Sequence, residues 1–409
     1  MAIIPVTSDI RIEMFHFTAP PPLSLYVHIP WCVRKCPYCD FNSHEVRDEI
    51  PEQAYVDALM ADLEQDLPQV WGRTVETVFI GGGTPSLFSP AAISRLLSGL
   101  RARLPLKPAA EITLEANPGT VDQERFQGFR EAGINRLSIG IQSFDRSLLQ
   151  RIGRIHDDRE ALDAVRAAQQ AGFDNINLDL MFGLPGQTLD QALEDLQTAL
   201  DLGPAHISWY ELTIEPNTWF HRHPPERSSD ELLWTMQEQG RSLLEAGGYT
   251  RYEVSAYSKG QQRCRHNLNY WQFGDYLGIG AGAHAKITDA GQQGVTRIAK
   301  TRHPRAYLEH AADQRRIANE ARLGVDDVTL EYALNALRLD RGFTAEEFSA
   351  ATGLPFSATA KPVSAALEQG LLEYNNDTIR TTAKGQRYLN EVLHYWLTDT
   401  REHARAGQR

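Results

Sequence analysis

Residues 23–39 read LSLYVHIPWCVRKCPYC and combine a strand-like run with a cluster of cysteines. Residues 24–29 are apolar and rich in β-branched and aromatic side chains, which predicts a strand. Cys32, Cys36 and Cys39 follow at C-x₃-C-x₂-C spacing, on what we expect to be a loop. In a reducing compartment such clustering favours metal or redox chemistry over a disulfide framework.

Short runs of the same kind recur to about residue 214 and alternate with segments of helical period. Parallel strands need helical crossovers, so six β–α units in succession predict a parallel sheet. No strand-following Gly-x-Gly-x-x-Gly opens a helix in this part of the sequence, which weakens a dinucleotide-binding interpretation. We therefore predict an α/β fold with a partial (β/α)₆ TIM-like barrel. The expected strands are 24–29, 75–80, 111–115, 136–141, 175–181 and 206–213, and the helices between them are 52–65, 91–103, 121–132, 158–171 and 189–202.

Polar and glycine residues gather where the expected strands end. Residues at the carboxyl ends of barrel strands converge on one face, where such enzymes place their sites. The clusters therefore predict a single site. They are 28–32, 81–85, 115–118, 142–144, 179–185 and 211–216.

A second unit is expected after the barrel and its extension. From about Pro304 three helices, a short hairpin around Asn375 and a last helix resemble a winged-helix α+β module. Acidic residues outnumber basic ones in this unit, which favours a packing or lid role over DNA binding. The expected division is an N-terminal tail at 1–22, the barrel with its extension at 23–303, the module at 304–400 and a tail at 401–409.

Charge and hydropathy exclude several classes of protein. The 409 residues carry 53 Asp and Glu against 41 Lys and Arg, a net charge of −12 that argues against nucleic acid as a partner. The uncharged stretches 14–33 and 77–94 are broken by prolines, and by histidines or glycines, so we expect no membrane span. Asp9, Arg11 and Glu13 stand where a signal peptide would need an apolar run. We therefore expect a cytoplasmic protein.

The cysteine spacing admits three kinds of chemistry. Three thiolates can hold three irons of a [4Fe–4S] cluster and leave the fourth iron open to a small chelating molecule. Zinc also binds thiolates, but a closed zinc site needs four ligands and would have to recruit His28 or His44. Cys36 and Cys39 alone match the dithiol of glutaredoxins, although that interpretation leaves the third cysteine unexplained.

Two further motifs extend the pattern. Tyr26-Val-His-Ile-Pro-Trp-Cys32 precedes the cysteines, and Gly81-Gly-Gly-Thr-Pro85 ends the second expected strand. Together with the cysteine spacing they resemble the radical S-adenosylmethionine (radical SAM) superfamily. Within it, they are similar to the group of oxygen-independent coproporphyrinogen III dehydrogenases (HemN) and the related haem chaperones (HemW). The resemblance runs from about Leu23 to the end of the chain and implies a radical-SAM-type barrel.

The resemblance implies that Cys32, Cys36 and Cys39 ligate a [4Fe–4S] cluster and that S-adenosylmethionine (SAM) chelates its open iron. It also implies SAM contacts at the strand ends. Each of these residues also has a structural interpretation. The glycines are typical of a tight turn, the charged residues of ion pairs at the barrel rim, and the tyrosines of a packed core. The implied SAM-site residues are Tyr26, Tyr38, Gly82, Gly83, Thr84, Glu115, Gln142, Arg154 and Asp179.

Two features separate the HemN and HemW branches. The dehydrogenases typically carry a further cysteine two places after the third and a longer N-terminal extension. Here Cys39 is followed by Asp40 and Phe41, and 31 residues precede Cys32. The HemW branch carries phenylalanine at that place and a His-Asn-x-x-Tyr-Trp motif, which residues 266–271 match. The resemblance therefore implies a haem chaperone, with no catalytic residue assigned.

Haem binding also has a basis in these residues. Imidazole or thiolate can be an axial ligand to haem iron, and Cys264 and His266 supply both. Tyr270 and Trp271 can stack on a porphyrin face. A histidine near aromatic side chains is equally typical of a packed, hydrogen-bonded core. His284 and the histidines of residues 221–223 are the next candidates.

We therefore expect a carrier that binds haem, together with a [4Fe–4S] cluster and SAM, and passes the haem to an unidentified acceptor protein. The alternative is an active radical SAM enzyme on a tetrapyrrole. In that case an electron donor reduces the cluster, and the cluster's electron cleaves SAM to a 5′-deoxyadenosyl radical.

Overall fold

The computed structural model describes residues 15–406, and in the last helix it describes side chains as far as Leu397. Most of the expected N-terminal tail, residues 1–14, and the last three residues of the expected C-terminal tail lie outside the described residues. None of the helices in the described part is both long and apolar enough to cross a membrane.

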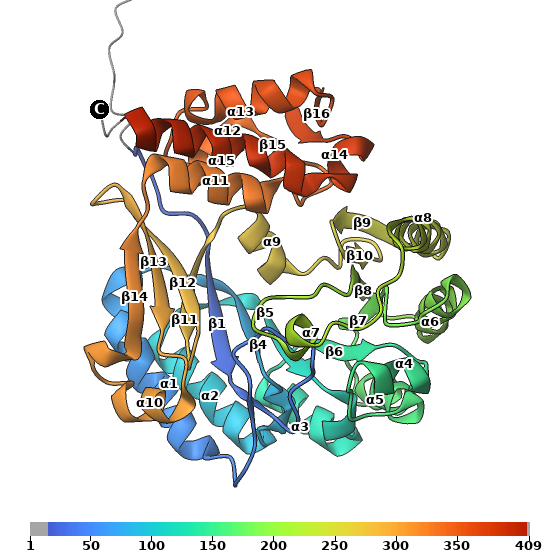
Figure 1. The fold of residues 1–409 in the computed structure, drawn as a ribbon. Helices are drawn as coiled ribbons and strands as arrows, with labels where there is room; N and C mark the ends of the chain where they lie inside the picture. The colour runs from blue at the N-terminus through green and yellow to red at the C-terminus, as the bar shows by residue number, and fades with distance from the viewer. Residues whose placement is uncertain (1–14, 407–409) are drawn as a thin grey trace, which may run out of the picture.

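A curved twelve-stranded sheet runs through the centre of the molecule (Figure 1). The six expected strands lie side by side in chain order and all pair in parallel. The predicted partial (β/α)₆ barrel is therefore confirmed. These strands are β1 (Leu23–Ile29), β4 (Val75–Gly82), β5 (Leu106–Ala116), β6 (Arg136–Gln142), β7 (Ile176–Phe182) and β8 (His206–Glu211).

The crossover helices, together with α8 after the last parallel strand, cover the outer face of these strands (Figure 1). Their ends follow from local sequence signals. Asp157 and Glu160 form a capping box at the start of α5, and Thr188 and Gln191 form one at the start of α6, so the first backbone N–H groups of both helices are satisfied. Gly203 ends α6 in the left-handed conformation. The helices are α1 (Glu52–Asp66), α2 (Pro90–Arg103), α3 (Gln123–Ala132), α4 (Arg146–Arg151), α5 (Asp158–Gln170), α6 (Leu189–Leu202) and α8 (Asp230–Ala246).

The sheet continues beyond both ends of the predicted barrel. On the far side of β1, strand β11 (Asp275–Ile279) pairs in parallel, and β12 (His284–Asp289), β13 (Gly294–Lys300) and β14 (Ile317–Arg322) follow antiparallel. Beyond β8 lie β10 (Ala256–Ser258) and β9 (Thr250–Glu253). Strand β1, which leads into the cysteines, is therefore an inner strand with β4 on one side and β11 on the other.

The C-terminal module lies at the end of the sheet (Figure 1) and has an apolar core of its own. A short strand, β15 (Phe343–Thr344), joins the expected hairpin to give a three-stranded wing. The elements are α11 (Val325–Ala336), α12 (Ala345–Thr352), α13 (Ser357–Glu368), β16 (Leu372–Asn375), β17 (Thr378–Thr381), α14 (Ala383–Arg387) and α15 (Leu389–Ala406).

The boundaries of this module differ from the expected division. Helix α10 (Pro304–His310) places Tyr307 in the core of the barrel, and β14 belongs to the main sheet, so the module begins near α11 rather than at Pro304. Phe17 is buried in the core of the module, so residues 15–22 are not a loose tail. Helix α15 continues through Arg401 to Ala406.

Candidate functional site

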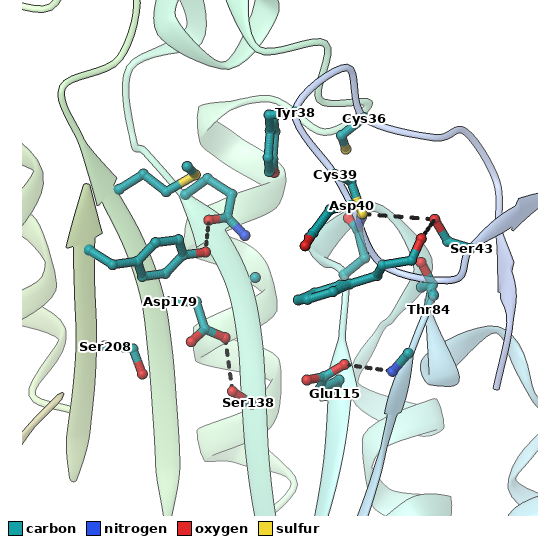
Figure 2. A pocket seen from close by; sticks show the side chains of 18 of the residues that line it. Cys36, Tyr38, Cys39, Asp40, Ser43, Thr84, Glu115, Ser138, Asp179 and Ser208 are labelled. Atoms are coloured by element: carbon teal, nitrogen blue, oxygen red, sulfur yellow. Dashed lines mark hydrogen bonds between the residues drawn. The ribbon is translucent and has the colours of Figure 1, made fainter. Parts of the chain in front are cut away.

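The three clustered cysteines lie on a compact loop that follows β1. Two short parallel strands, β2 (Trp31–Cys32) and β3 (His44–Glu45), close the loop, because the backbone of Val46 donates to the carbonyl of Cys32 at 2.9 Å. Within it, the N–H of Cys39 donates to the carbonyl of Cys36 at 3.1 Å. All three thiols line one cavity (Figure 2 labels Cys36 and Cys39).

Asn42 anchors this loop to the far side of β1. Its Nδ2 donates to the carbonyls of Ala281 and Arg302, both at 2.8 Å, and its own carbonyl lies 2.9 Å from Nε2 of His28. A Cβ on Gly282 would lie 2.3 Å from the Asn42 side chain, so only glycine allows this approach. The loop is therefore held by residues that follow β11 and β13.

The glycine motif at the end of β4 packs directly under the cysteine loop. Gly83 N–H donates to the Ile29 carbonyl at 2.8 Å, and Thr84 N–H donates to the Trp31 carbonyl at 2.7 Å. A Cβ on Gly83 would lie 2.5 Å from the Trp31 carbonyl oxygen and 3.0 Å from Sγ of Cys32. The protein's own cysteine loop therefore occupies the space beside Gly83. This contact is a reason for glycine at this position that the sequence did not indicate.

The cavity that holds the cysteines measures about 460 Å³, within the usual range for ligand sites. Figure 2 shows Cys36, Cys39 and Tyr38 at one end of it and Asp179 and Glu115 at the other. Every predicted SAM-site residue except Tyr26 lines this cavity, so the strand ends do converge on a single site. They are Tyr38, Gly82, Gly83, Thr84, Glu115, Gln142, Arg154 and Asp179.

Two buried carboxyl groups give this cavity an acidic wall. Oε2 of Glu115 accepts from the N–H of Gly82 at 3.1 Å, and Asp179 accepts from Ser138 and Asn177, both at 2.8 Å. Burial, followed by repulsion from Asp179, raises the pKa of Glu115 to about 8. Burial also raises the pKa of Asp179. Such groups suit a ligand that brings positive charge or hydroxyl donors.

Arg154 brings a positive charge to the cysteine end of the cavity. Its Nη2 donates to the carbonyl of Gly140 at 2.5 Å and its Nη1 lies 3.6 Å from Sγ of Cys36. Its Nε is buried without a hydrogen-bond partner among the described residues. A planar guanidinium with a free N–H edge is suited to a ligand carboxylate.

Gln142 stands in a strained backbone conformation at the end of β6, with φ of 70°, and its Oε1 accepts from the hydroxyl of Tyr210 at 2.8 Å. Non-glycine residues with positive φ are uncommon and concentrate at functional sites. Tyr210 lines the same cavity. The sequence marked its strand end, residues 211–216, but did not single out this tyrosine.

Tyr26 lies instead in a second cavity of about 380 Å³. Its hydroxyl is 3.1 Å from Nδ1 of His28, and Tyr26 does not line the cavity that holds the other implied SAM-site residues. Both ring nitrogens of His28 are thereby hydrogen-bonded, and the ring is not free to complete a zinc site. The second cavity adjoins the first, because Asp40, Phe41, Gly82 and Glu115 line both. Its other lining residues are Tyr26, His28, Asn42, Tyr270, Tyr276, Gly282, His284 and Arg302.

His266 lines neither cavity, and both of its ring nitrogens are engaged. It is 1% exposed at the start of α9 (Arg265–Trp271), with Nδ1 2.7 Å from the Thr77 hydroxyl and Nε2 3.1 Å from the Tyr270 hydroxyl. Burial, followed by the charge of Arg136, lowers the pKa of His266 to about 3, so the ring stays neutral. The structure therefore shows the packed core histidine, which was the alternative interpretation.

Cys264 also lines neither of the two cavities. It is fully buried, its Sγ lies 3.7 Å from Oε1 of Glu111, and burial raises the pKa of its thiol to about 12. Cys32, Cys36 and Cys39, in contrast, all line the first cavity. The structure does not support Cys264 as a haem ligand either.

The remaining residues of the His266 motif do reach the cavities. Tyr270 lines the second cavity and packs edge-on against Tyr276, with ring centroids 4.4 Å apart. Asn267 and Trp271 line the first cavity, and the Arg338 guanidinium lies 4.4 Å from the centre of the Trp271 ring. The motif therefore contributes aromatic side chains to the walls of both cavities, and the hydrogen bond with His266 holds Tyr270 in position.

Other residues of the two cavities carry no sequence signal of their own. The second cavity is lined in part by Asn42 from the cysteine loop, Tyr276 from β11 and Arg302 from the segment after β13. These residues are far apart in the chain, so the sequence does not show that they share a cavity. Ser208 also lines the first cavity, but it lies within β8 and outside the polar cluster at residues 211–216.

Comparison with known sequences agrees with this geometry. The profile of the Radical SAM superfamily matches residues 26–199, and that of the HemN C-terminal domain matches residues 325–388. The chain is 49% identical to "Heme chaperone HemW" of Escherichia coli (strain K12), with 93% of this chain and 99% of that protein covered. It is 34% identical to the protein of the same name in Bacillus subtilis (strain 168), with 91% and 99% covered.

Among solved structures, the fold is similar to that of the E. coli coproporphyrinogen III oxidase HemN, described as a radical SAM enzyme. The TM-score is 0.78 at 23% sequence identity, with 92% of this chain and 90% of that chain covered. At this identity the likeness supports the shared fold.

Proposed function

The chain belongs to the HemW family of the radical SAM superfamily, and on this premise we propose that it is a cytoplasmic carrier that binds haem and transfers it to an acceptor protein. The relatives that match it over nearly their whole length are named heme chaperones. The observation that carries the proposal is the pair of adjoining cavities. One holds the cysteines and the SAM-site residues, and the other remains for a second ligand.

We propose that the first cavity holds a [4Fe–4S] cluster on Cys32, Cys36 and Cys39, with SAM beside it. The residues fit these groups, because three thiols reach one cavity whose remaining wall is polar and carries both charges. Arg154 would pair with the SAM carboxylate, and Glu115 and Asp179 would accept from its hydroxyl or ammonium groups. When bound, a reduced cluster of this kind supplies an electron that can cleave SAM.

The second candidate function is radical SAM catalysis on a tetrapyrrole with an external electron donor. The convergence of eight of the nine expected SAM-site residues on one cavity favours it. Phe41 argues against the dehydrogenase reaction, since this side chain is 60% exposed where the dehydrogenases typically carry their further cysteine. We therefore propose haem carriage as the main function and expect no decarboxylation of coproporphyrinogen III.

Anaerobic reconstitution tests the cluster. We expect about four iron and four sulfide per chain. Cys32→Ala, Cys36→Ala and Cys39→Ala should each abolish the cluster, while Cys264→Ala should keep it, because Cys264 lines neither cavity. Stoichiometric zinc without iron–sulfur absorption would refute this part of the proposal.

Titration of the reconstituted protein with haem tests the carrier function. We expect saturable binding with a Soret band, followed by loss of that band when an acceptor such as an apo-haemoprotein is added. A separate incubation with SAM, a reductant and coproporphyrinogen III should give no divinyl product. Catalytic formation of that product would favour the enzyme over the carrier.

A further inference from the structure

The second cavity contains one histidine whose ring is free. His284, the first residue of β12, is exposed to the cavity, and neither of its ring nitrogens has a hydrogen-bond partner among the described residues. His28, which lines the same cavity, has both nitrogens engaged by Tyr26 and Asn42. His284 is therefore the imidazole at this cavity that can coordinate a metal without breaking an existing contact.

Aromatic side chains form walls near this histidine. Tyr270 and Tyr276 pack edge-on at 4.4 Å, and Phe41 is 60% exposed where the two cavities adjoin. The exposed ring of Phe41 and the partly buried rings of Tyr270 and Tyr276 are suited to contact a large planar ring. The volume of about 380 Å³ lies within the range for ligand sites, and the cavity opens toward the surface at the exposed residues His284 and Arg302.

A cation lies at the same opening. Arg302 lines the cavity, and its guanidinium makes no hydrogen bond or ion pair with any described residue. Its backbone carbonyl is fixed by Asn42 at 2.8 Å, so the base of the side chain is held. A guanidinium on a fixed backbone is suited to bind a carboxylate in two-point fashion.

We propose that haem occupies this second cavity, with His284 as an axial ligand to the iron and Arg302 as the partner of a propionate. The assignment rests on the proposed haem carriage and replaces His266 and Cys264 as iron ligands. Tyr270 and Tyr276 then contact the porphyrin, and Phe41, Gly82 and Glu115 form the wall shared with the SAM cavity. Haem and SAM therefore occupy neighbouring compartments, and neither displaces the other.

Haem titration of the full-length, cluster-loaded chain tests the assignment, with absorbance difference spectra as the readout. His284→Ala removes the donor atom and should abolish the Soret band of histidine-ligated haem. It should raise the apparent Kd at least about tenfold, since even loss of a residue that supports a metal ligand has an effect of that size. Added imidazole should restore the band in His284→Ala. Arg302→Gln should weaken binding and leave the band position unchanged.

His303→Ala is the matched control. His303 is an exposed histidine at the same corner of the molecule whose ring packs edge-on against His44, 5.7 Å away, and it does not line the cavity. Its replacement should leave both band and Kd unchanged. Cluster content and far-ultraviolet circular dichroism should match the unaltered chain in every variant, and His284→Met should shift the band rather than abolish it.

The possible outcomes test haem carriage and the assignment of His284 separately. If the unaltered chain binds no haem, the carrier function itself is refuted. If the unaltered chain binds haem and His284→Ala keeps the same band and Kd, the carrier function stands and the assignment of His284 is refuted. An effect of His303→Ala equal to that of His284→Ala would also refute it.

Discussion

Gly83→Ala should damage the cysteine loop although it adds one methyl group. The new Cβ would lie 2.5 Å from the carbonyl oxygen of Trp31, about 0.9 Å short of the 3.4 Å at which ordinary contact begins, and 3.0 Å from Sγ of Cys32. A carbonyl oxygen cannot rotate away as a side chain can. The backbone of β2 has to move, and the Thr84–Trp31 hydrogen bond of 2.7 Å stretches or breaks.

The size of the effect follows from these two contacts. Overpacking of a tight site costs about 1–3 kcal/mol, and a lost backbone hydrogen bond adds about 1 kcal/mol. We therefore expect the free energy of unfolding to fall by about 3 kcal/mol. Because the displaced backbone carries Cys32, the iron and sulfide content after reconstitution should fall as well.

Gly119→Ala provides the matched comparison. A Cβ there meets its nearest atom, the Cβ of His156, at 3.5 Å, and the backbone of Gly119 has no left-handed φ, so the same methyl group finds room. Urea unfolding and iron and sulfide analysis of both variants give the answer. Equal stability and equal cluster content in the two would show that the contact between Gly83 and the loop does not set the shape of the site.

Two further predictions concern buried titratable groups. His266→Ala should lower the free energy of unfolding, measured in urea, by about 3 kcal/mol, because it empties a buried site and removes a partner of Thr77 and Tyr270. The haem bands should persist in this variant. Loss of those bands with unchanged stability would restore His266 as the ligand. Glu115 has a pKa raised from 4.5 to about 8, so the folded protein keeps a proton that the unfolded chain releases, and stability should fall as pH rises across that window. Glu115→Gln should flatten this fall in urea midpoints measured from about pH 5 to about pH 9, and an unchanged slope would contradict the assignment.

The barrel could be predicted because its signals are local. Each strand and crossover helix is marked by its own hydrophobic period and caps, and the order of parallel strands then follows the order of the chain. Strand β11 was missed as a neighbour of β1, because the pairing joins Leu23 to Asp275 and no local pattern specifies such a distant partner. The start of the module was placed too early for the same reason, since β14 reads as a separate segment until its pairing with β13 is seen.

The candidate site divides in the same way. The strand-end residues were predicted, because the carboxyl ends of parallel strands meet whatever the details of packing. Tyr26, His266 and Cys264 lie outside the first cavity, and the contacts of His266 and Cys264 depend on partners far along the chain. Thr77 lies 189 residues from His266, and a sequence does not show whether an imidazole nitrogen is engaged by a hydroxyl or free for a metal.

The hydrogen bonds from Asn42 to Ala281 and Arg302 also affect when the cysteine loop can be fixed during synthesis of the chain. The cysteines leave the ribosome early, while the carbonyl groups that fix their loop are made 239 and 260 residues later than Asn42. At about 5–20 residues per second this interval lasts roughly 10–50 s. During that interval the loop with the three thiols lacks these anchors, so we expect the iron–sulfur centre to assemble at the end of synthesis. A chain truncated before residue 302 lacks one of the two carbonyl anchors of this loop.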